Sequence, residues 1–340
     1  MTQYYHHNAP FTLESGEVLP ELTIAYDTYG TLNAAGDNAV WVMHALTANS
    51  DVADWWPHTV EAGKFLDPAR HFVVCANVLG SCYGTTGPTS VNPATGRPYG
   101  ASFPDVTVRD MVACHKLLRR HLGISRIDTV IGSSLGGFQA IEWLVDEPDV
   151  ARKAVLIATD YCCRPWLAAI NKAMYMAMEA DPTLGANAPD AGRKGLAAAR
   201  AIALLSYRSH AAYNMTQADT PGARDADPFT RRVHSYQAYQ GRKLCDRFDA
   251  QSYLRMCRSA DSHDVGRLRG SAAEALKRVK VRCLVVAISS DILFPPSTHE
   301  EMASMLDADY RLIDSDFAHD GFLIEHEKLD RIIKEFQATI

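Results

Sequence analysis

The sequence has no excess of positive charge and no long apolar run, and each absence excludes a class of protein. Its 34 Lys and Arg residues are outnumbered by 40 Asp and Glu residues, which gives a formal net charge of −6 at pH 7. A nucleic-acid-binding chain is usually basic, so we expect no nucleic-acid partner. No stretch approaches the roughly 18–20 apolar residues of a membrane-spanning helix, so we expect no membrane partner.

Paired cysteine spacings are also missing, and the first residues have neither the basic region nor the apolar run of a secretory leader, so we expect none. The eight cysteines are scattered, and no two of them are spaced as C-x-x-C. Disulfide frameworks are typical of short secreted chains, so we expect reduced thiols and a cytoplasmic location. The H-E-x-x-H pattern and paired Cys/His spacings are absent as well, so we expect no metal and no bound cofactor.

What the sequence does have is an alternation of strand-like and helix-like patterns. Apolar residues recur at helical spacing over 108–122, with Thr107 placed to cap this helix and Gly123 placed to end it. Strands that alternate with helices indicate an α/β fold, with a mostly parallel sheet and helices on both faces. Short apolar runs rich in β-branched residues predict strands at 39–44, 72–75, 127–131, 154–158, 281–288 and 309–313.

The strand pattern stops after residue 160 and returns near residue 280. We therefore expect an α/β core made of residues 1–160 and 280–340, with a helical lid inserted at 161–279. Such an insertion is tolerated when its ends lie close together, and it would cover the carboxyl ends of the strands, where α/β sheets place their sites. Helical patterns within it run over about 164–180, 193–213, 227–247, 249–259 and 271–279.

A G-x-S-x-G match places Ser134 between a predicted strand and a predicted helix. This context is typical of a nucleophile elbow, in which a sharp turn exposes the serine hydroxyl and requires small neighbours such as Gly132 and Gly136. The N–H of Leu135 would then face a developing oxyanion. The alternative is a tightly packed strand-to-helix turn without a catalytic role.

A nucleophilic serine needs a base, and the base needs an acid that orients it. In α/β hydrolases the acid and the histidine follow the serine, each in a loop after a late strand. Asp291 and His319 occupy these two loops in this order, and no other histidine has a comparable position. Asp314 and Asp316 are weaker candidates for the acid because they share the loop of the histidine. A turn or a helix cap is the alternative role for Asp291.

A second oxyanion donor is expected in the loop that follows an early strand. That loop begins at His44, and the backbone N–H of Leu46 or of Thr47 has the right place in the chain. The sequence leaves the choice between these two groups open.

Four blocks, in order, resemble the homoserine O-acetyltransferase family of the α/β-hydrolase superfamily. They are 77–100, the elbow with the following 139–143, 262–267 and 319–323, and the resemblance extends from about residue 11 to residue 336. The family makes O-acetylhomoserine for methionine synthesis. The resemblance therefore implies the α/β-hydrolase fold with a helical lid, and a homodimer that forms through the lid.

The resemblance also assigns roles to individual residues. It implies that Ser134, Asp291 and His319 form the catalytic triad. Arg200 matches the arginine that holds the carboxylate of the amino-acid substrate, and Asp320 matches the acid that holds its ammonium group. The alternative roles are a surface arginine of a helix for Arg200 and a loop cap for Asp320, and without the resemblance the residues favour this alternative for Arg200. A guanidinium can bind a carboxylate through two parallel hydrogen bonds, which agrees with the role implied for Arg200.

The implied reaction is transfer of an acetyl group from acetyl-CoA to the hydroxyl of L-homoserine, through an acyl-serine intermediate. The chain departs from the family pattern at Ser133 and Leu135, at Ser81 and over 47–49. These positions are expected to surround the acyl pocket and to bear on the donor. The alternatives are succinyl-CoA as donor, serine as acceptor, an ester or amide hydrolase, or a protein with no catalysis.

Overall fold

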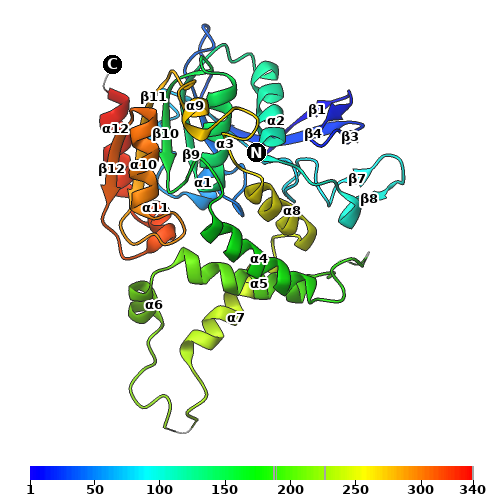
Figure 1. Ribbon diagram of the computed structural model, residues 1–340, viewed down its shortest axis with the longest axis vertical. Helices are drawn as coiled ribbons and strands as arrows, with labels where there is room; N and C mark the ends of the chain where they lie inside the picture. The colour runs from blue at the N-terminus through cyan, green and yellow to red at the C-terminus, as the bar shows by residue number, and fades with distance from the viewer. Residues whose placement is uncertain (187, 189, 226, 339–340) are drawn as a thin grey trace.

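The computed structural model describes residues 1–186, 188, 190–225 and 227–338, and its centre is an eight-stranded sheet (Figure 1). The two strands at one edge run antiparallel to their neighbours, and all other neighbouring strands are parallel. In spatial order the strands are β1 (Gln3–His7), β4 (Leu22–Tyr29), β6 (Phe72–Ala76), β5 (Ala39–Met43), β9 (Ile127–Ser133), β10 (Ala151–Ile157), β11 (Arg282–Ile288) and β12 (Asp309–Ile313).

All six strands predicted from the sequence belong to this sheet, and the mostly parallel arrangement is confirmed. β1 and β4 were not predicted. β1 reads QYYHH, and only two of its side chains are even half-buried, so it carries no apolar run. β4 is largely buried, but a buried Asp27 interrupts its apolar pattern.

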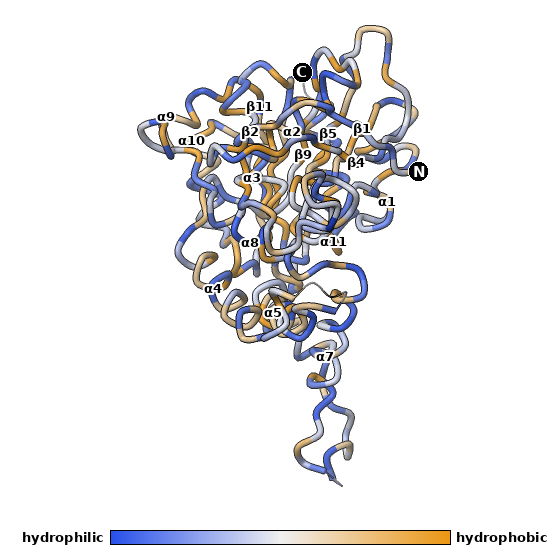
Figure 2. The backbone as a smooth tube through the Cα atoms, turned by 90° about the vertical axis from the view of Figure 1, so that its right-hand side faces the viewer, coloured by the Kyte–Doolittle hydropathy of each residue, from blue (hydrophilic) through white to orange (hydrophobic). Residues whose placement is uncertain are grey.

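Helices cover both faces of the sheet, as the sequence predicts. Alternate residues of β5 enter two different cores, with Trp41 and Met43 on one face and Val40 and Val42 on the other. Burial on both faces explains why the parallel strands are nearly continuous apolar runs, drawn in orange inside the molecule in Figure 2. The first face carries α2 (Val108–His121) and α3 (Leu135–Asp146), and the second carries α1 (Val52–Trp55) and α12 (His326–Ala338).

The ends of α2 form as predicted. The Thr107 side chain accepts a hydrogen bond from the Asp110 N–H, and the Asp110 carboxylate accepts one from the Thr107 N–H, a reciprocal cap that stabilises a helix by about 1 kcal/mol. Gly123 has a φ of +69° just after the helix. The shorter elements are β2 (Phe11–Thr12), β3 (Val18–Leu19), β7 (Val91–Asn92), β8 (Arg97–Pro98), α10 (Pro296–Leu306) and α11 (Gly321–Ile324).

In the described residues, every regular element between β10 and β11 is a helix. In Figure 1, α4 to α7 form the lower part of the molecule, whereas α9 lies beside the sheet in the upper part. α6 and α7 lie far from the sheet, at the lower end of the molecule in Figure 1. Figure 2 shows α7 below α5 in the same way. No helix in the described ranges is both long enough and apolar enough to cross a membrane. The helices are α4 (Pro165–Glu179), α5 (Arg193–Tyr207), α6 (His210–Gln217), α7 (Arg232–Cys245), α8 (Ala250–Asp261) and α9 (Ala272–Leu276).

Two of the predicted helices of the lid need correction. The stretch 193–213 is not one helix, because Arg208 is extended and Ser209 caps a new helix by accepting a hydrogen bond from the Ala212 N–H. Serine favours this position because its hydroxyl oxygen can satisfy a free N–H at a helix start. The stretch 227–247 becomes helical only at Arg232.

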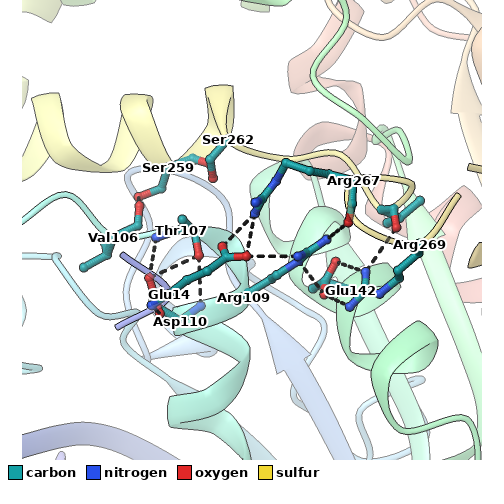
Figure 3. Close-up of polar contacts among 11 residues, drawn as sticks. Glu14, Val106, Thr107, Arg109, Asp110, Glu142, Ser259, Ser262, Arg267 and Arg269 are labelled. Carbon is teal, nitrogen blue, oxygen red and sulfur yellow. Dashed lines mark hydrogen bonds and ion pairs between the residues drawn. The ribbon is translucent and has the colours of Figure 1, made fainter. Parts of the chain in front are cut away.

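Ion pairs fix the chain to the core where it returns from α8 (Figure 3). Arg267 donates to both carboxylate oxygens of Glu14 at 2.7 Å, and Arg269 binds the buried carboxylate of Glu142. Arg109, on α2, reaches Glu14 at 2.9 Å and Glu142 at 3.3 Å. One network of five charged residues therefore joins the N-terminal segment, α2, α3 and the end of the helical lid.

Candidate active site

Ser134 lies in a sharp turn between β9 and α3. Its φ of 54° and ψ of −124° are rare for a residue other than glycine, and such strain is typical of functional sites. The turn needs its glycines, because a Cβ on Gly136 would lie 1.9 Å from the carbonyl oxygen of Met43. A Cβ on Gly132 would lie 2.4 Å from the carbonyl oxygen of Gly136. The local geometry is that of a nucleophile elbow.

The structure brings Ser134, His319 and Asp291 into one chain of hydrogen bonds. His319 Nε2 lies 2.9 Å from Ser134 Oγ, and His319 Nδ1 lies 2.8 Å from Asp291 Oδ2. The other Asp291 oxygen accepts hydrogen bonds from the N–H groups of Leu293 and Phe294. An ionised carboxylate only accepts, so Nδ1 of the histidine donates to it, and Nε2 is free to take the serine proton.

Three aromatic rings surround the imidazole of His319. The ring centres of Tyr207, Phe294 and Phe322 lie 5.6, 5.4 and 5.5 Å from that of the histidine. They come from α5, from the loop after β11 and from α11, so both the core and the helical lid contribute to this wall. The imidazole is therefore packed against apolar ring surface from both parts of the molecule.

The loop after β5 lies beside the serine, and His44 holds it there. In this fully buried ring, Nδ1 donates to the Ala45 carbonyl at 2.8 Å and Nε2 accepts from the Val78 N–H at 3.3 Å. Burial lowers the pKa of His44 to about 4, so the ring is neutral at pH 7 and can accept this bond. Leu46 lines the same cavity as Ser134, and Leu135 begins α3, where backbone N–H groups lack a partner within the helix.

Arg200 and Asp320 line the same cavity as Ser134 and His319. The Arg200 guanidinium lies over the Tyr207 ring at 5.4 Å and has no carboxylate partner in the part of the chain that the structure describes. Asp320 accepts a hydrogen bond from Nε of Arg208 at 3.0 Å. Burial raises the pKa of Asp320, and the positive charge of Arg208 opposes this effect. The cavity thus holds an unpaired cation near a carboxylate.

Several residues of the site were not singled out from the sequence. Tyr207 follows Arg200 by seven positions, which places both on one face of α5. This spacing in the sequence indicates that Tyr207 lies on the same side of the helix as Arg200. No such spacing indicates Arg208, because it lies at a helix break that the sequence pattern did not reveal. Lys243 and Arg247, which also line the cavity, look like ordinary solvated cations in the sequence.

The cavity has a volume of about 440 Å³, which is within the usual range for a small-molecule site. It opens between the loop after β5, α1, α5, α7 and the segment around His319. In the described ranges, no cluster of three or more His, Cys, Asp or Glu side chains is arranged to hold a metal ion. The remaining lining residues are Ala45, Thr47, Ala48, Asn49, Asp54, Trp55, Gln240, Leu244, Phe322 and Leu323.

Solved structures of both esterases and acyltransferases share this fold. The structure superposes on a homoserine O-acetyltransferase from Bacillus anthracis with a TM-score of 0.92 and 23% identity, covering 100% of this chain and 98% of that one. It superposes on esterase E22 with a TM-score of 0.90 and 24% identity, covering 99% of each chain. At these identities the likeness shows the fold alone.

Sequence similarity to known proteins is more specific. Residues 38–325 match the family described as alpha/beta hydrolase fold. The chain is 42% identical over 338 residues to the homoserine O-acetyltransferase of Cyclobacterium marinum, covering 99% of this chain and 95% of the relative. It is 45% identical over 363 residues to that of Moorella thermoacetica, covering 98% and 95%. Because this similarity extends over nearly the whole length of both chains at more than 40% identity, the chain belongs to the homoserine O-acetyltransferase family of acyltransferases.

Proposed function

We propose that the protein transfers an acetyl group from acetyl-CoA to the hydroxyl of L-homoserine, as a cytoplasmic step of methionine biosynthesis. One observation carries this proposal: a serine, a histidine and an aspartate joined by hydrogen bonds share a cavity with Arg200 and Asp320. A nucleophile alone fits many reactions. A cation and a carboxylate beside it fit an acceptor that carries both a carboxylate and an ammonium group.

The first half-reaction acylates the serine. His319 Nε2 takes the proton of Ser134 Oγ as the oxygen attacks the thioester carbonyl, and Asp291 stabilises the imidazolium that forms. The backbone N–H groups of Leu135 and Leu46 are our candidates for the donors that stabilise the oxyanion. The C–S bond then breaks, the imidazolium protonates the departing thiolate, and acetyl-Ser134 remains.

The second half-reaction transfers the acetyl group. The carboxylate of homoserine binds Arg200, and its ammonium group binds Asp320. Because Asp320 directly follows His319 in the chain, this contact holds the homoserine hydroxyl close to the imidazole. His319 removes the hydroxyl proton, the oxygen attacks acetyl-Ser134, and the released serine oxygen recovers a proton from the imidazolium. The kinetics are then ping-pong.

The competing hypothesis is a simple ester hydrolase, since esterases share this fold. Arg200 favours the transferase: an uncompensated guanidinium facing a cavity has no use in hydrolysis of a neutral ester, and it fits an amino-acid acceptor. The aromatic wall around His319 also limits the water that would otherwise hydrolyse the acyl-enzyme.

We also propose that the protein is a homodimer formed through the helical lid. Large apolar side chains are exposed on the part of the lid that extends from the core. Met215 on α6 is 61% exposed, Phe229 before α7 is 85% exposed and Tyr239 on α7 is 52% exposed. Burial of such a surface against a second copy would stabilise it. Sedimentation of the purified protein at micromolar concentration tests this proposal, and a monomer would contradict it.

Trapping of the intermediate tests the proposed reaction. After incubation with acetyl-CoA alone, mass spectrometry should find one acetyl group per chain, on the peptide that contains Ser134. Addition of L-homoserine should remove it and yield O-acetylhomoserine. Ser134→Ala should take up no acetyl group, whereas Ser90→Ala, a serine outside the cavity, should acylate as the parent does. Acetylation of Ser134→Ala to the same extent would refute the mechanism.

A further inference from the structure

Two cations lie at the solvent end of the cavity that reaches Ser134. Lys243, on the last turn of α7, and Arg247, which follows this helix, are four residues apart, and both are exposed and line the cavity. The mechanism proposed above uses neither of them. A pair of positive charges at the opening of a site, in a chain with a net charge of −6, calls for a physical explanation.

Among the described residues, no carboxylate forms an ion pair with either of these two cations. In the described ranges, Lys243 has no acidic partner. Arg247 donates to the Thr47 carbonyl at 2.5 Å and to the Tyr83 hydroxyl at 2.6 Å, both of them uncharged groups. The neighbouring Asp246 is already paired with Arg193. Arg247 is therefore fixed in position while its charge remains available to a ligand.

Among the described residues that line the cavity, Asp54 is the one carboxylate other than Asp320. It is exposed and lies on α1. Arg200 lines the cavity too and adds a third positive charge, whereas Asp320 is compensated by Arg208. The opening is thus positive on the α7 side, and this charge pattern suits an anion larger than homoserine.

On the basis of the proposed function, we propose that Lys243 and Arg247 bind the phosphates of the nucleotide part of the acyl donor. A CoA thioester carries its acyl group at one end of a pantetheine arm and a phosphorylated nucleotide at the other. With the thioester at Ser134, the arm fills the cavity and the phosphates lie at its opening. A lysine and an arginine both form charge-assisted hydrogen bonds to phosphate oxygens.

The test compares two donors that differ in the nucleotide. Lys243→Gln should raise the KM for acetyl-CoA about tenfold, the effect of losing one charge-assisted hydrogen bond. The KM for S-acetylpantetheine, which lacks every phosphate, should change less than twofold. Arg242→Gln is the matched control, because Arg242 is an exposed cation on the same helix that does not line the cavity. Arg247 is less suitable as a variant, because it also holds the loop at Thr47.

Two further results are expected from the same charges. Salt should raise the KM for acetyl-CoA in the parent protein, and Lys243→Gln should reduce this dependence, because salt screens exposed charges. Asp54→Asn should lower the KM for acetyl-CoA, since it removes the opposing charge at the opening.

The result that overturns the inference is a Lys243→Gln variant in which the KM values for both donors change equally, or neither changes. A parent protein that uses acetyl-CoA and S-acetylpantetheine with the same KM would also refute it, while leaving the proposed reaction intact. If the parent protein transfers no acetyl group, the proposed function fails separately. Calorimetric titration of CoA against the parent and Lys243→Gln then still tests the phosphate site, and equal affinities would refute it.

Discussion

The guanidinium of Arg208 donates from Nε to Asp320 Oδ2 at 3.0 Å, next to the histidine of the proposed triad. This contact ties the helical lid to the loop that carries His319, because Arg208 directly follows α5. It also favours the ionised form of a half-buried carboxylate, since burial raises the pKa of Asp320 and the Arg208 charge opposes the rise. The lid thereby supports the charge that we propose to bind the acceptor.

The first prediction concerns pH. Asp320 must be ionised to bind an ammonium group, so kcat/KM for homoserine should fall on the acid side as Asp320 takes up a proton. Removal of the Arg208 charge raises the pKa of Asp320 further, so Arg208→Met should shift this acid limb to higher pH. Arg208→Lys should restore part of the shift. An acid limb at the same pH in Arg208→Met would contradict the proposed pairing.

The second prediction separates the two substrates. Arg200→Gln should raise the KM for homoserine about 10- to 100-fold, as expected for loss of a charge-assisted carboxylate contact. Acylation of Ser134 by acetyl-CoA, measured as burst amplitude without acceptor, should persist, because the donor does not need this contact. Arg193→Gln, on the exposed start of α5, serves as control. Loss of the burst together with acceptor binding would mean that Arg200 acts in the first step.

A third prediction concerns the ion-pair network at the return from the helical lid. Glu142 is buried and binds the half-buried Arg269 and Arg109, so Glu142→Gln removes the ion-pair partner of Arg269 and leaves Arg109 with Glu14 alone. Breaking such a pair costs about 3–5 kcal/mol of unfolding free energy. Glu179→Gln, which removes an exposed pair with Lys172, should cost about 1 kcal/mol or less. Urea unfolding measures both, and equal losses would show that the network contributes no more than a surface pair.

The fourth prediction concerns acid stability. Burial lowers the pKa of His44 and of His115 to about 4 and that of His263 to about 3. The unfolded chain, with histidine pKa values of about 6.5, then binds more protons than the folded chain between about pH 4 and 6.5. Stability should therefore fall as the pH drops from 6.5 towards 4, by up to about 3 kcal/mol per histidine.

His115 gives the cleanest test of this effect, because it lies outside the cavity and its Nε2 is 2.8 Å from Gln139 Oε1. The variant His115→Gln should reduce the dependence of the unfolding free energy on pH by about one proton. The exposed His234→Gln is the control. An unchanged slope in His115→Gln would show that this ring is not neutral in the folded protein.

Patterns that repeat along the chain made the core of the fold predictable. The six apolar runs became six strands, and the residues at their carboxyl ends came together at one edge of the sheet, which is why Ser134, Asp291 and His319 could be named as a set. In a parallel sheet, the loops that follow the carboxyl ends of the strands lie close together, and the order of these loops can be read from the sequence.

Contacts between the helical lid and the core were not predictable in the same way. The pairing of Arg208 with Asp320 depends on the helix break before Ser209, whose side chain caps the next helix. No periodic pattern in the sequence indicates where this break falls. The antiparallel strand β1 was missed because pairing with β4, rather than its own polar sequence, stabilises it. In the sequence, only the family resemblance indicates a substrate-binding role for Arg200.

The most direct test of the account is thiol release from acetyl-CoA, measured with and without L-homoserine, with succinyl-CoA and L-serine in parallel. We predict a small burst of thiol without acceptor, and sustained thiol release that requires homoserine and is faster with acetyl-CoA than with succinyl-CoA. Preference for succinyl-CoA or serine would keep the acyl-serine mechanism and change the substrate. Sustained thiol release at an equal rate without any acceptor would contradict the proposed acyl transfer to homoserine, because water would then be the acceptor and the protein a hydrolase.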